Sequence, residues 1–193
     1  QAHLMFGDQS LMSAKELNLE GSHNLANALA ALALGHAVGL DLVAMCKALK
    51  RFKGLPHRMQ KVAETQGVRW VNDSKATNIG ACIAALQGYQ RKVILIAGGD
   101  GKGADMSELA PIVQEKTKAV ILMGKDAELI DRALNNCVPT HYANDMKEAV
   151  KIAAELASVG DNVLLSPACA SLDQYKSYAD RGNKFAEAVM GLM

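Results

Sequence analysis

The sequence has almost no excess charge and no apolar run long enough to cross a membrane. Its 21 Lys and Arg residues nearly balance its 20 Asp and Glu residues, which leaves a formal net charge of +1. A protein that binds nucleic acid non-specifically usually has a clear basic excess, so we expect no nucleic-acid partner. The longest apolar segments, such as residues 93–97, have the length of a strand. Since a membrane-spanning helix needs roughly 20 apolar residues, we expect no membrane partner either.

Other familiar signals are also missing. The four cysteines form no CxxC pair, which indicates neither a zinc site nor a disulfide framework and is typical of a reducing compartment. The five histidines have no HExxH or other close ligand spacing, so we expect no metal site within this chain. The N-terminal residues contain no charged-then-apolar signal segment, and we expect a cytoplasmic protein. The first residue is a glutamine, which is compatible with a piece of a longer protein.

The first 55 residues read as a mainly helical segment. Half of the 193 residues are hydrophobic, which excludes a disordered chain. Residues 13–19 alternate loosely and are compatible with a strand. The apolar spacing then predicts two helices, over residues 25–38 and 40–49, with Asp41 as the N-cap of the second. Gly54 and Pro56 follow and predict a domain boundary.

From residue 56 onward, strands and helices alternate. The pattern predicts a hairpin over residues 59–72, and then strands over 92–97, 119–123, 138–142 and 162–165. Helices are expected over residues 76–87, 106–116, 127–135, 145–158 and 175–190. Such alternation is typical of βαβ units, and continuous apolar strands indicate a sheet covered on both faces. We therefore predict an α/β, Rossmann-like fold over residues 56–193: a mostly parallel sheet with helices on both faces.

Three polar segments, residues 72–78, 98–103 and 166–173, follow predicted strands. Because ligands bind at the carboxyl ends of the strands in an open α/β sheet, we expect these segments along one edge and near a ligand. In the first of them, Ser74 or Thr77 can simply cap the next helix. The acid, amine and hydroxyl groups that lie together there also suit a bound polar ligand.

The other two segments leave similar alternatives open. Residues 98–103 contain four glycines, which allow a ligand to approach closely, and Lys102 adds a cation for a phosphate or carboxylate. The segment matches neither GxxxxGK followed by Ser or Thr nor GxGxxG, and a plain flexible turn is an equal interpretation. Ser171 can cap a helix or donate to an anion. Cys169 between alanines, and Trp70 in a strand pattern, are expected to be core residues.

Five segments, taken in order, resemble the Mur ligases of peptidoglycan synthesis. Residues 21–27 resemble the HNxxN helix start of the family, and residues 54–59 resemble its interdomain segment. The match is completed by residues 72–78, by residues 98–103, and by residues 165–174 with Arg181 and Gly182 after them. The resemblance spans about residues 13–190. Within the family, residues 72–78 are similar to those of members that add D-glutamate.

The resemblance implies a three-domain enzyme that forms an amide through an acyl phosphate. Residues 1–55 would be the C-terminal part of a central ATPase domain, and residues 56–193 a Rossmann-like domain that presents the amino acid. The implied substrates are ATP, D-glutamate and UDP-N-acetylmuramoyl-L-alanine. The Mg²⁺ ligands, the phosphate-binding loop and the UDP-binding domain would lie upstream of this chain. The resemblance further implies that the last domain closes onto the central one, with a hinge over residues 53–57. We also expect a monomer.

The resemblance also assigns roles to individual residues. ATP would be bound by Asn24, Asn27, Arg58 and Asp73, with Asn27 on the adenine, Arg58 on the phosphates and Asp73 on the ribose or base side. D-Glutamate would be bound by Lys75, Thr77, Lys102, Ser171, the backbone of Leu172, and Tyr178, where the family often has Phe. Lys102 and Arg58 would position substrates, and we expect no further catalytic residue in this chain.

Two other interpretations remain open. The first is a stand-alone Rossmann-like binding module for a nucleotide or an acidic amino acid, without catalysis, because no catalytic apparatus is visible. The second is a ligase of the folylpolyglutamate type, which shares the architecture. Residues 72–78 and 55–59 argue against that second interpretation.

Overall fold

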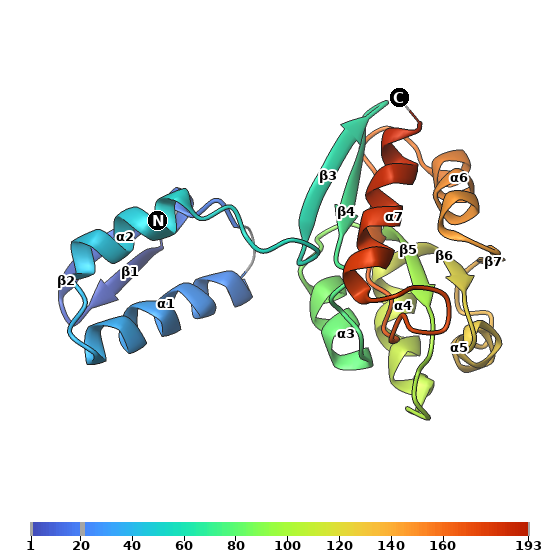
Figure 1. Cartoon of the computed structure of the whole chain (residues 1–193), viewed down its shortest axis with the longest axis horizontal. Helices are drawn as coiled ribbons and strands as arrows, with labels where there is room; N and C mark the ends of the chain where they lie inside the picture. Colours follow the sequence, from blue (N-terminus) through green and yellow to red (C-terminus); the bar gives the residue numbers. More distant parts are fainter. Residues whose placement is uncertain (1, 20–21, 193) are drawn as a thin grey trace. The chain divides into compact units, whose positions relative to one another are not determined.

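The computed structural model describes residues 2–19 and 22–192, without the side chains of Ser22 and His23. It divides the chain into two compact units, Gln1–Gly54 and Leu55–Met193 (Figure 1). Gly21 and the His23 side chain, which belong to the predicted HNxxN helix start, therefore lie outside the described residues.

The first unit combines a two-stranded hairpin with two helices. Strands β1 (His3–Phe6) and β2 (Gln9–Ser13) pair antiparallel. The strand expected over residues 13–19 is wrong, because Ser13 and Glu16 form a capping box that starts a 3-10 helix, η1 (Ala14–Glu16). The two predicted helices are confirmed as α1 (Ser22–Ala37) and α2 (Leu42–Arg51). Asp41 caps α2 as expected, since its carboxylate accepts from the Ala44 N–H at 2.8 Å.

The second unit is built on a six-stranded sheet in the order β3-β4-β8-β5-β6-β7. Its strands are β3 (Gln60–Thr65), β4 (Val68–Asn72), β5 (Val93–Gly98), β6 (Thr117–Met123), β7 (Thr140–Tyr142) and β8 (Asn162–Leu165). Strand β3 runs antiparallel to β4 as a hairpin, and all other neighbouring strands are parallel. The predicted mostly parallel sheet is confirmed.

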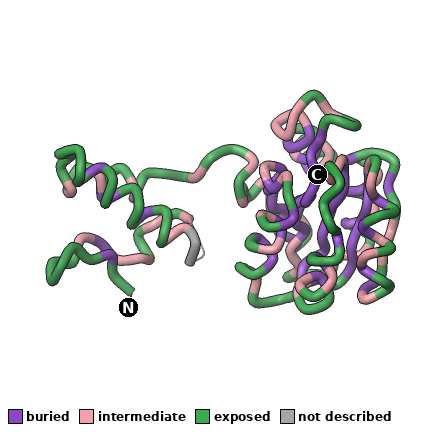
Figure 2. The backbone as a smooth tube through the Cα atoms, turned by 90° about the horizontal axis from the view of Figure 1, so that it is seen from below, coloured by how far each residue is buried: buried purple, intermediate pink, exposed green. Residues whose placement is uncertain are grey.

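Helices cover both faces of this sheet. One face packs against α3 (Ile79–Gln87), the 3-10 helix η2 (Met106–Leu109), α4 (Ala110–Lys116) and α5 (Ala127–Leu134). The other face packs against α6 (Met146–Leu156) and α7 (Tyr178–Met190). Successive residues of β5 alternate between the two clusters, Val93 and Leu95 on one side and Ile94 and Ile96 on the other. The buried residues accordingly gather along the central strands (Figure 2).

Two helices begin later than the sequence predicts, and this leaves loops at the sheet edge. Helix α3 begins at Ile79 because the Asn78 side chain accepts from the Ala81 N–H at 2.9 Å. Helix α7 begins at Tyr178 because the Ser177 side chain accepts from the Asp180 N–H at 3.1 Å. The residues before each cap remain available to line a site.

None of the described helices combines the length and the apolar character that crossing a membrane requires.

Candidate functional site

The loops that follow β4, β8 and β5 lie side by side at one edge of the sheet, because those three strands are neighbours. The Asp73 N–H, after β4, donates to the Leu165 carbonyl at the end of β8 at 2.8 Å. Asp100, after β5, and Ala170, after β8, exchange two backbone hydrogen bonds of 3.0 and 2.9 Å. The expected grouping of the three polar segments along one edge is therefore confirmed.

Arg181 of α7 ties these three loops together and is only 2% exposed. Its Nε donates to Ser74 Oγ at 3.0 Å, and its Nη2 donates to the carbonyls of Ser74 and Cys169 at 3.0 and 3.1 Å. Its Nη1 reaches the carbonyls of Gly98 and Ala170 at 3.4 and 3.3 Å. Every one of these acceptors is a hydroxyl or carbonyl oxygen. Burial lowers the pKa of Arg181 to about 10, so the guanidinium stays charged at neutral pH.

From the sequence, Arg181 belongs to the resemblance but has no assigned role. A signal was present, because Arg181, Phe185 and Val189 recur at four-residue spacing and are all buried on one face of α7. An arginine on the apolar face of a helix needs partners for its donors, and the carbonyls of the neighbouring loops provide them.

Asp73 joins the loop after β4 to two other segments. Its Oδ2 accepts from Ser166 Oγ at 3.0 Å and its Oδ1 accepts from the Met59 N–H at 3.2 Å. The side chain is 8% exposed, and burial raises the pKa of Asp73 to about 6, against the opposing effect of those hydrogen bonds. Both carboxylate oxygens thus bind the protein itself, and the ribose or base contact of Asp73 stays a prediction.

Lys75 and Tyr178 are brought into contact from distant parts of the sequence. The Lys75 ammonium lies 4.1 Å from the centroid of the Tyr178 ring, a cation–π contact. Ser74 Oγ donates to the Tyr178 carbonyl at 2.7 Å, which fixes the start of α7 against this loop. Thr77, two residues after Lys75, is half-buried. Neither Ser74 nor Thr77 is the cap of α3, because Asn78 occupies that position.

The loop that carries Lys102 is closely packed at its base. Gly98 has a φ of 117°, and a Cβ there would clash with the Met123 carbonyl oxygen, so the position requires glycine. Lys102 itself is exposed and has a φ of 53°, and its N–H donates to Asp100 Oδ1 at 2.9 Å. These contacts argue against a plain flexible turn.

Ser171 and Leu172 share the loop after β8 but differ in exposure. Ser171 is buried, whereas Leu172 is exposed. The expectation that Ser171 could cap a helix is wrong, because α7 begins seven residues later and is capped by Ser177. The Ser171 carbonyl instead accepts from the N–H groups of Gln174 and Tyr175 at 3.2 and 2.8 Å, which forms a turn.

A fourth loop at this edge, the turn between β6 and α5, was missed by the sequence analysis. Asp126 Oδ2 accepts from the Gly101 N–H at 2.7 Å. The Lys125 N–H donates to Asp173 Oδ2 at 2.9 Å, and Lys125 Nζ lies 3.3 Å from Asp100 Oδ2. The turn follows a strand as apolar as the others, so the rule that selected the three polar segments would also have selected this one.

His57 anchors the segment that contains Arg58. Asn72 Nδ2 lies 3.2 Å from His57 Nδ1 and donates to the Gly182 carbonyl at 2.9 Å. The imidazole packs so closely on α7 that a Cβ at Gly182 would clash with it. Burial lowers the pKa of His57. Arg58 is exposed beside this anchor.

The remaining predicted ATP-binding residues, Asn24 and Asn27, lie in α1 of the first unit, where Asn27 is exposed. Their role toward ATP stays a prediction.

Cys169 and Trp70 are core residues, as expected. Both are buried, and burial raises the pKa of the Cys169 thiol to about 12, which suits packing rather than nucleophilic attack.

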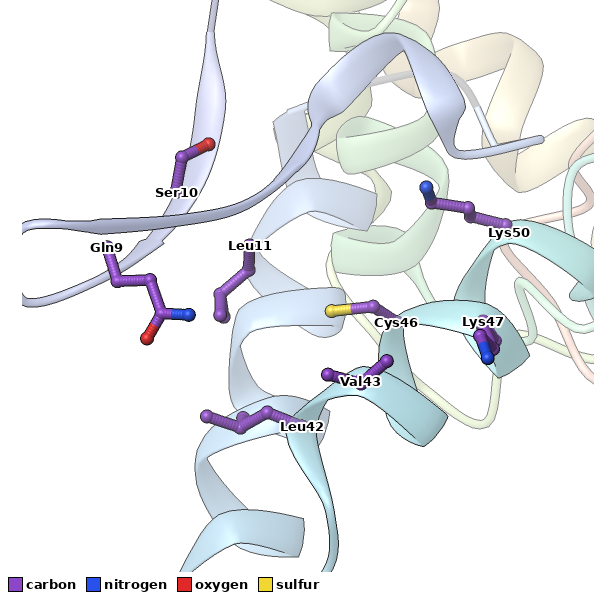
Figure 3. Close-up of a pocket in the computed structure, with 8 residues that line it drawn as sticks. All are labelled: Gln9, Ser10, Leu11, Leu42, Val43, Cys46, Lys47 and Lys50. Atoms are coloured by element: carbon purple, nitrogen blue, oxygen red, sulfur yellow. The ribbon is translucent and has the colours of Figure 1, made fainter.

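Two pockets lie away from this edge. In the first unit, Leu11 of β2 faces Cys46 of α2 across a pocket of about 200 Å³ (Figure 3). A pocket of about 470 Å³ in the second unit is lined by Glu128, Asp131, Arg132 and Tyr142. Neither pocket includes a predicted site residue.

Comparison with known proteins places these features in a family. A family model described as "Mur ligase, glutamate ligase domain" matches residues 57–169. A UDP-N-acetylmuramoylalanine--D-glutamate ligase from Methylococcus capsulatus is 55% identical over 192 residues, which cover 100% of this chain and 42% of that relative. The ligase of the same name from Pseudomonas aeruginosa is 54% identical over 193 residues, which cover 98% and 43%. The chain thus spans less than half the length of these curated relatives.

Solved structures show that the fold is shared more widely. UDP-N-acetylmuramate-alanine ligase from Thermotoga maritima has a TM-score of 0.66 at 18% identity, over 92% of this chain and 40% of that structure. A bifunctional folylpolyglutamate synthase/dihydrofolate synthase from Yersinia pestis has a TM-score of 0.70 at 21% identity, over 98% and 43%.

Proposed function

The chain belongs to the Mur ligase family, and we propose that it is the C-terminal part of an ATP-dependent ligase that adds D-glutamate to UDP-N-acetylmuramoyl-L-alanine. The amide product is a precursor of peptidoglycan. The proposal is supported by the two relatives named UDP-N-acetylmuramoylalanine--D-glutamate ligase, which match nearly the whole chain at 54–55% identity. Because the chain spans 42–43% of those relatives, the activity is proposed for the complete protein.

The proposed reaction has two steps. The terminal phosphoryl group of ATP is transferred to the alanyl carboxylate, which gives an acyl phosphate and ADP. The amine of D-glutamate then attacks the acyl carbon, and the tetrahedral intermediate collapses with loss of phosphate. Negative charge builds up on oxygen in both steps, so positioning and electrostatic stabilisation dominate catalysis. The groups of this chain bind and orient substrates.

The observation that carries the proposal is the convergence of three loops on Arg181. The Arg181 contacts hold the loops of Lys75, Lys102 and Ser171 at one edge of the sheet, although the first and the last of these residues are far apart along the chain. D-Glutamate brings two carboxylates, which need cations, hydroxyls or backbone N–H groups. We assign these to Lys75, Thr77, Lys102, Ser171 and the Leu172 backbone, with Tyr178 packing beside Lys75.

ATP is assigned to the segment beside this edge and to α1. Arg58 would contact the phosphates and Asp73 the ribose or base side, while Asn24 and Asn27 would serve the adenine end. Each carboxylate oxygen of Asp73 already accepts one hydrogen bond, from Met59 and from Ser166. A carboxylate oxygen can accept two, so capacity remains for a ribose hydroxyl.

Mg²⁺, when bound, would offset the charge of the transferred phosphoryl group. Following the resemblance, we assign its ligands to the part of the enzyme outside this chain. We further propose a cytoplasmic location, which the scattered free thiols support, and a monomeric enzyme.

A substrate survey with the full-length protein tests the function. UDP-N-acetylmuramoyl-L-alanine, D-glutamate and ATP are supplied together and one at a time, and phosphate release and the UDP-linked dipeptide are measured. We expect product only when all three are present. L-Glutamate and folate serve as matched alternatives. Glutamylation of folate would favour a folylpolyglutamate-type ligase, and binding of ATP or D-glutamate without turnover would favour a binding module.

Two variants test the division of the site. Lys102→Ala removes a cation that faces a carboxylate, so we expect the KM for D-glutamate to rise about tenfold or more while the KM for ATP changes little. Arg58→Ala should chiefly impair the ATP-dependent step. Equal losses for both substrates in Lys102→Ala would refute the assignment of that lysine.

A further inference from the structure

The backbone around Lys102 is held from two sides. On one side, Asp100 accepts from the Lys102 N–H at 2.9 Å. On the other side, the Gly101 N–H donates to Asp126 Oδ2 at 2.7 Å, and the Asp126 N–H donates to the Gly99 carbonyl at 3.0 Å. The reciprocal pair between Asp126 and the loop therefore fixes the residue that directly precedes Lys102.

Asp126 makes this contact instead of the side-chain hydrogen bond that usually caps a helix. It occupies the N-cap position of α5, where an aspartate normally accepts from its own helix. In the described part of α5, its side chain makes no such capping hydrogen bond. Asp145, at the N-cap of α6, makes the ordinary contact, since its Oδ1 accepts from the Glu148 N–H at 2.8 Å. The carboxylate of Asp126 is instead directed at the loop of Lys102.

We propose that Asp126 is a positioning residue that holds the Lys102 loop in the conformation required to bind the carboxylate of the incoming amino acid. This inference rests on the proposed function. Lys102 has a left-handed backbone, with a φ of 53°, which an unsupported lysine rarely adopts. A charge-assisted hydrogen bond to the adjacent N–H favours that backbone before the substrate arrives. The ammonium then meets the carboxylate without first having to order its loop.

A purely electrostatic role for Asp126 predicts the opposite change in the KM for D-glutamate. A carboxylate near the binding place of an anionic substrate repels it, so its removal alone would lower the KM for D-glutamate. Positioning predicts a higher KM when the acceptor is lost, and a nearly normal KM when Asn keeps an acceptor oxygen at the same place.

The test compares Asp126→Ala, Asp126→Asn and the matched control Asp145→Ala in the full-length protein, with KM measured separately for D-glutamate and ATP. We expect Asp126→Ala to raise the KM for D-glutamate about tenfold and to leave the KM for ATP within about twofold. Asp126→Asn should restore most of the loss. Asp145→Ala, which removes an ordinary helix cap, should change neither constant.

A second readout does not require turnover. In the 193-residue chain, the Gly101 amide proton should resonate far downfield and exchange slowly, and Asp126→Ala should abolish both features. An unchanged or lower KM for D-glutamate in Asp126→Ala would overturn the inference, as would equal increases for both substrates or no rescue by Asn. If the wild-type protein ligates no D-glutamate, the proposed function fails and this inference with it, whatever the Gly101 amide shows. If the wild type ligates D-glutamate but the Asp126 variants give one of the contradicting results above, the inference fails and the proposed function stands.

Discussion

Trp70 and Leu95 in the second unit are each 1% exposed, whereas Leu34 and Val38 in the first unit are 71% and 76% exposed. The second unit has a six-stranded sheet with helices on both faces, so each apolar strand residue finds a covering layer. Among its described residues, the first unit has a two-stranded hairpin, the short 3-10 helix η1 and two α-helices. A hairpin of this size offers too little apolar surface to bury two helices.

The first unit therefore keeps a small core and a large exposed apolar surface. Its buried cluster consists of Leu4, Met12, Ala28, Leu32 and Cys46. The large exposed side chains are Met5, Phe6, Leu29, Leu34, Val38, Leu40, Val43 and Phe52. The two neighbouring stretches, both rich in helix, therefore differ in how much apolar surface they bury. Trp70 is the single tryptophan of the sequence, so its fluorescence reports on the second unit alone.

Expression of the two units as separate pieces is expected to reveal the largest difference in folding between them. Residues 55–193 expressed alone should unfold cooperatively, at the same denaturant midpoint as the intact chain when followed by Trp70 fluorescence. Residues 1–54 alone should lack stable helical structure, because their buried cluster is too small to offset the loss of chain entropy. Circular dichroism of the two pieces measures this. A cooperative thermal transition in residues 1–54 would show that the first unit folds without the second.

Replacement of Arg181 should substantially lower the stability of the second unit. Arg181→Ala leaves acceptors in three loops without their donor and opens a cavity, so we expect a loss of about 4 kcal/mol in the unfolding free energy. The control is Arg132→Ala, which removes an exposed pair with Glu128 on α5 and should cost less than about 0.5 kcal/mol. Urea unfolding followed by Trp70 fluorescence measures the unfolding free energies of both variants. A loss below about 1 kcal/mol in Arg181→Ala would show that the loops do not depend on this guanidinium.

Asp73 should make the stability of the second unit fall as the pH rises. Its folded pKa of about 6 lies above the ordinary value of 3.8, so between about pH 4 and pH 6 the unfolded chain releases a proton that the folded chain retains. The linkage amounts to about 3 kcal/mol, present below this range and lost above it.

Asp73→Asn removes this titration. We expect the unfolding free energy of the wild type, minus that of Asp73→Asn, to fall by about 2 kcal/mol between pH 4 and pH 7. Other carboxylates cancel in this difference because both proteins share them. A difference that is flat or that rises with pH would mean that Asp73 is ionised in the folded state throughout this range.

Matched helix caps should give the smallest effect. Asn78→Ala removes the cap of α3 in the second unit and should lower the free energy of the Trp70 transition by about 1 kcal/mol. Asp41→Ala removes the equivalent contact of α2 in the first unit and should leave that transition unmoved. Comparable shifts in the two variants would show that the units unfold together.

The alternation of strands and helices could be predicted because each apolar strand and each amphipathic helix carries its own periodicity. The edge that carries Asp73, Lys75 and Lys102 could also be predicted, since polar residues directly follow apolar strands. The first residues of α3 and α7 were predicted less accurately. Asn78 and Ser177 set these starts, because the side chain of each accepts from one N–H of the first turn. The roles of the substrate-binding residues came from the resemblance and stay predictions.

The class of fold, the polar edge and the family could be recognised in the sequence, because they depend on local periodicity and on short motifs. That Arg181 joins three loops, and that Asp126 is directed at Gly101 rather than at its own helix, depends on the packing of segments that are distant in the sequence. The Arg181 contacts depend on the strand order, which brings β4, β8 and β5 together, and the Asp126 contact depends on the pairing of β5 with β6. A donor or an acceptor is chosen by what lies within about 3 Å of it, and no pattern along the chain records that distance.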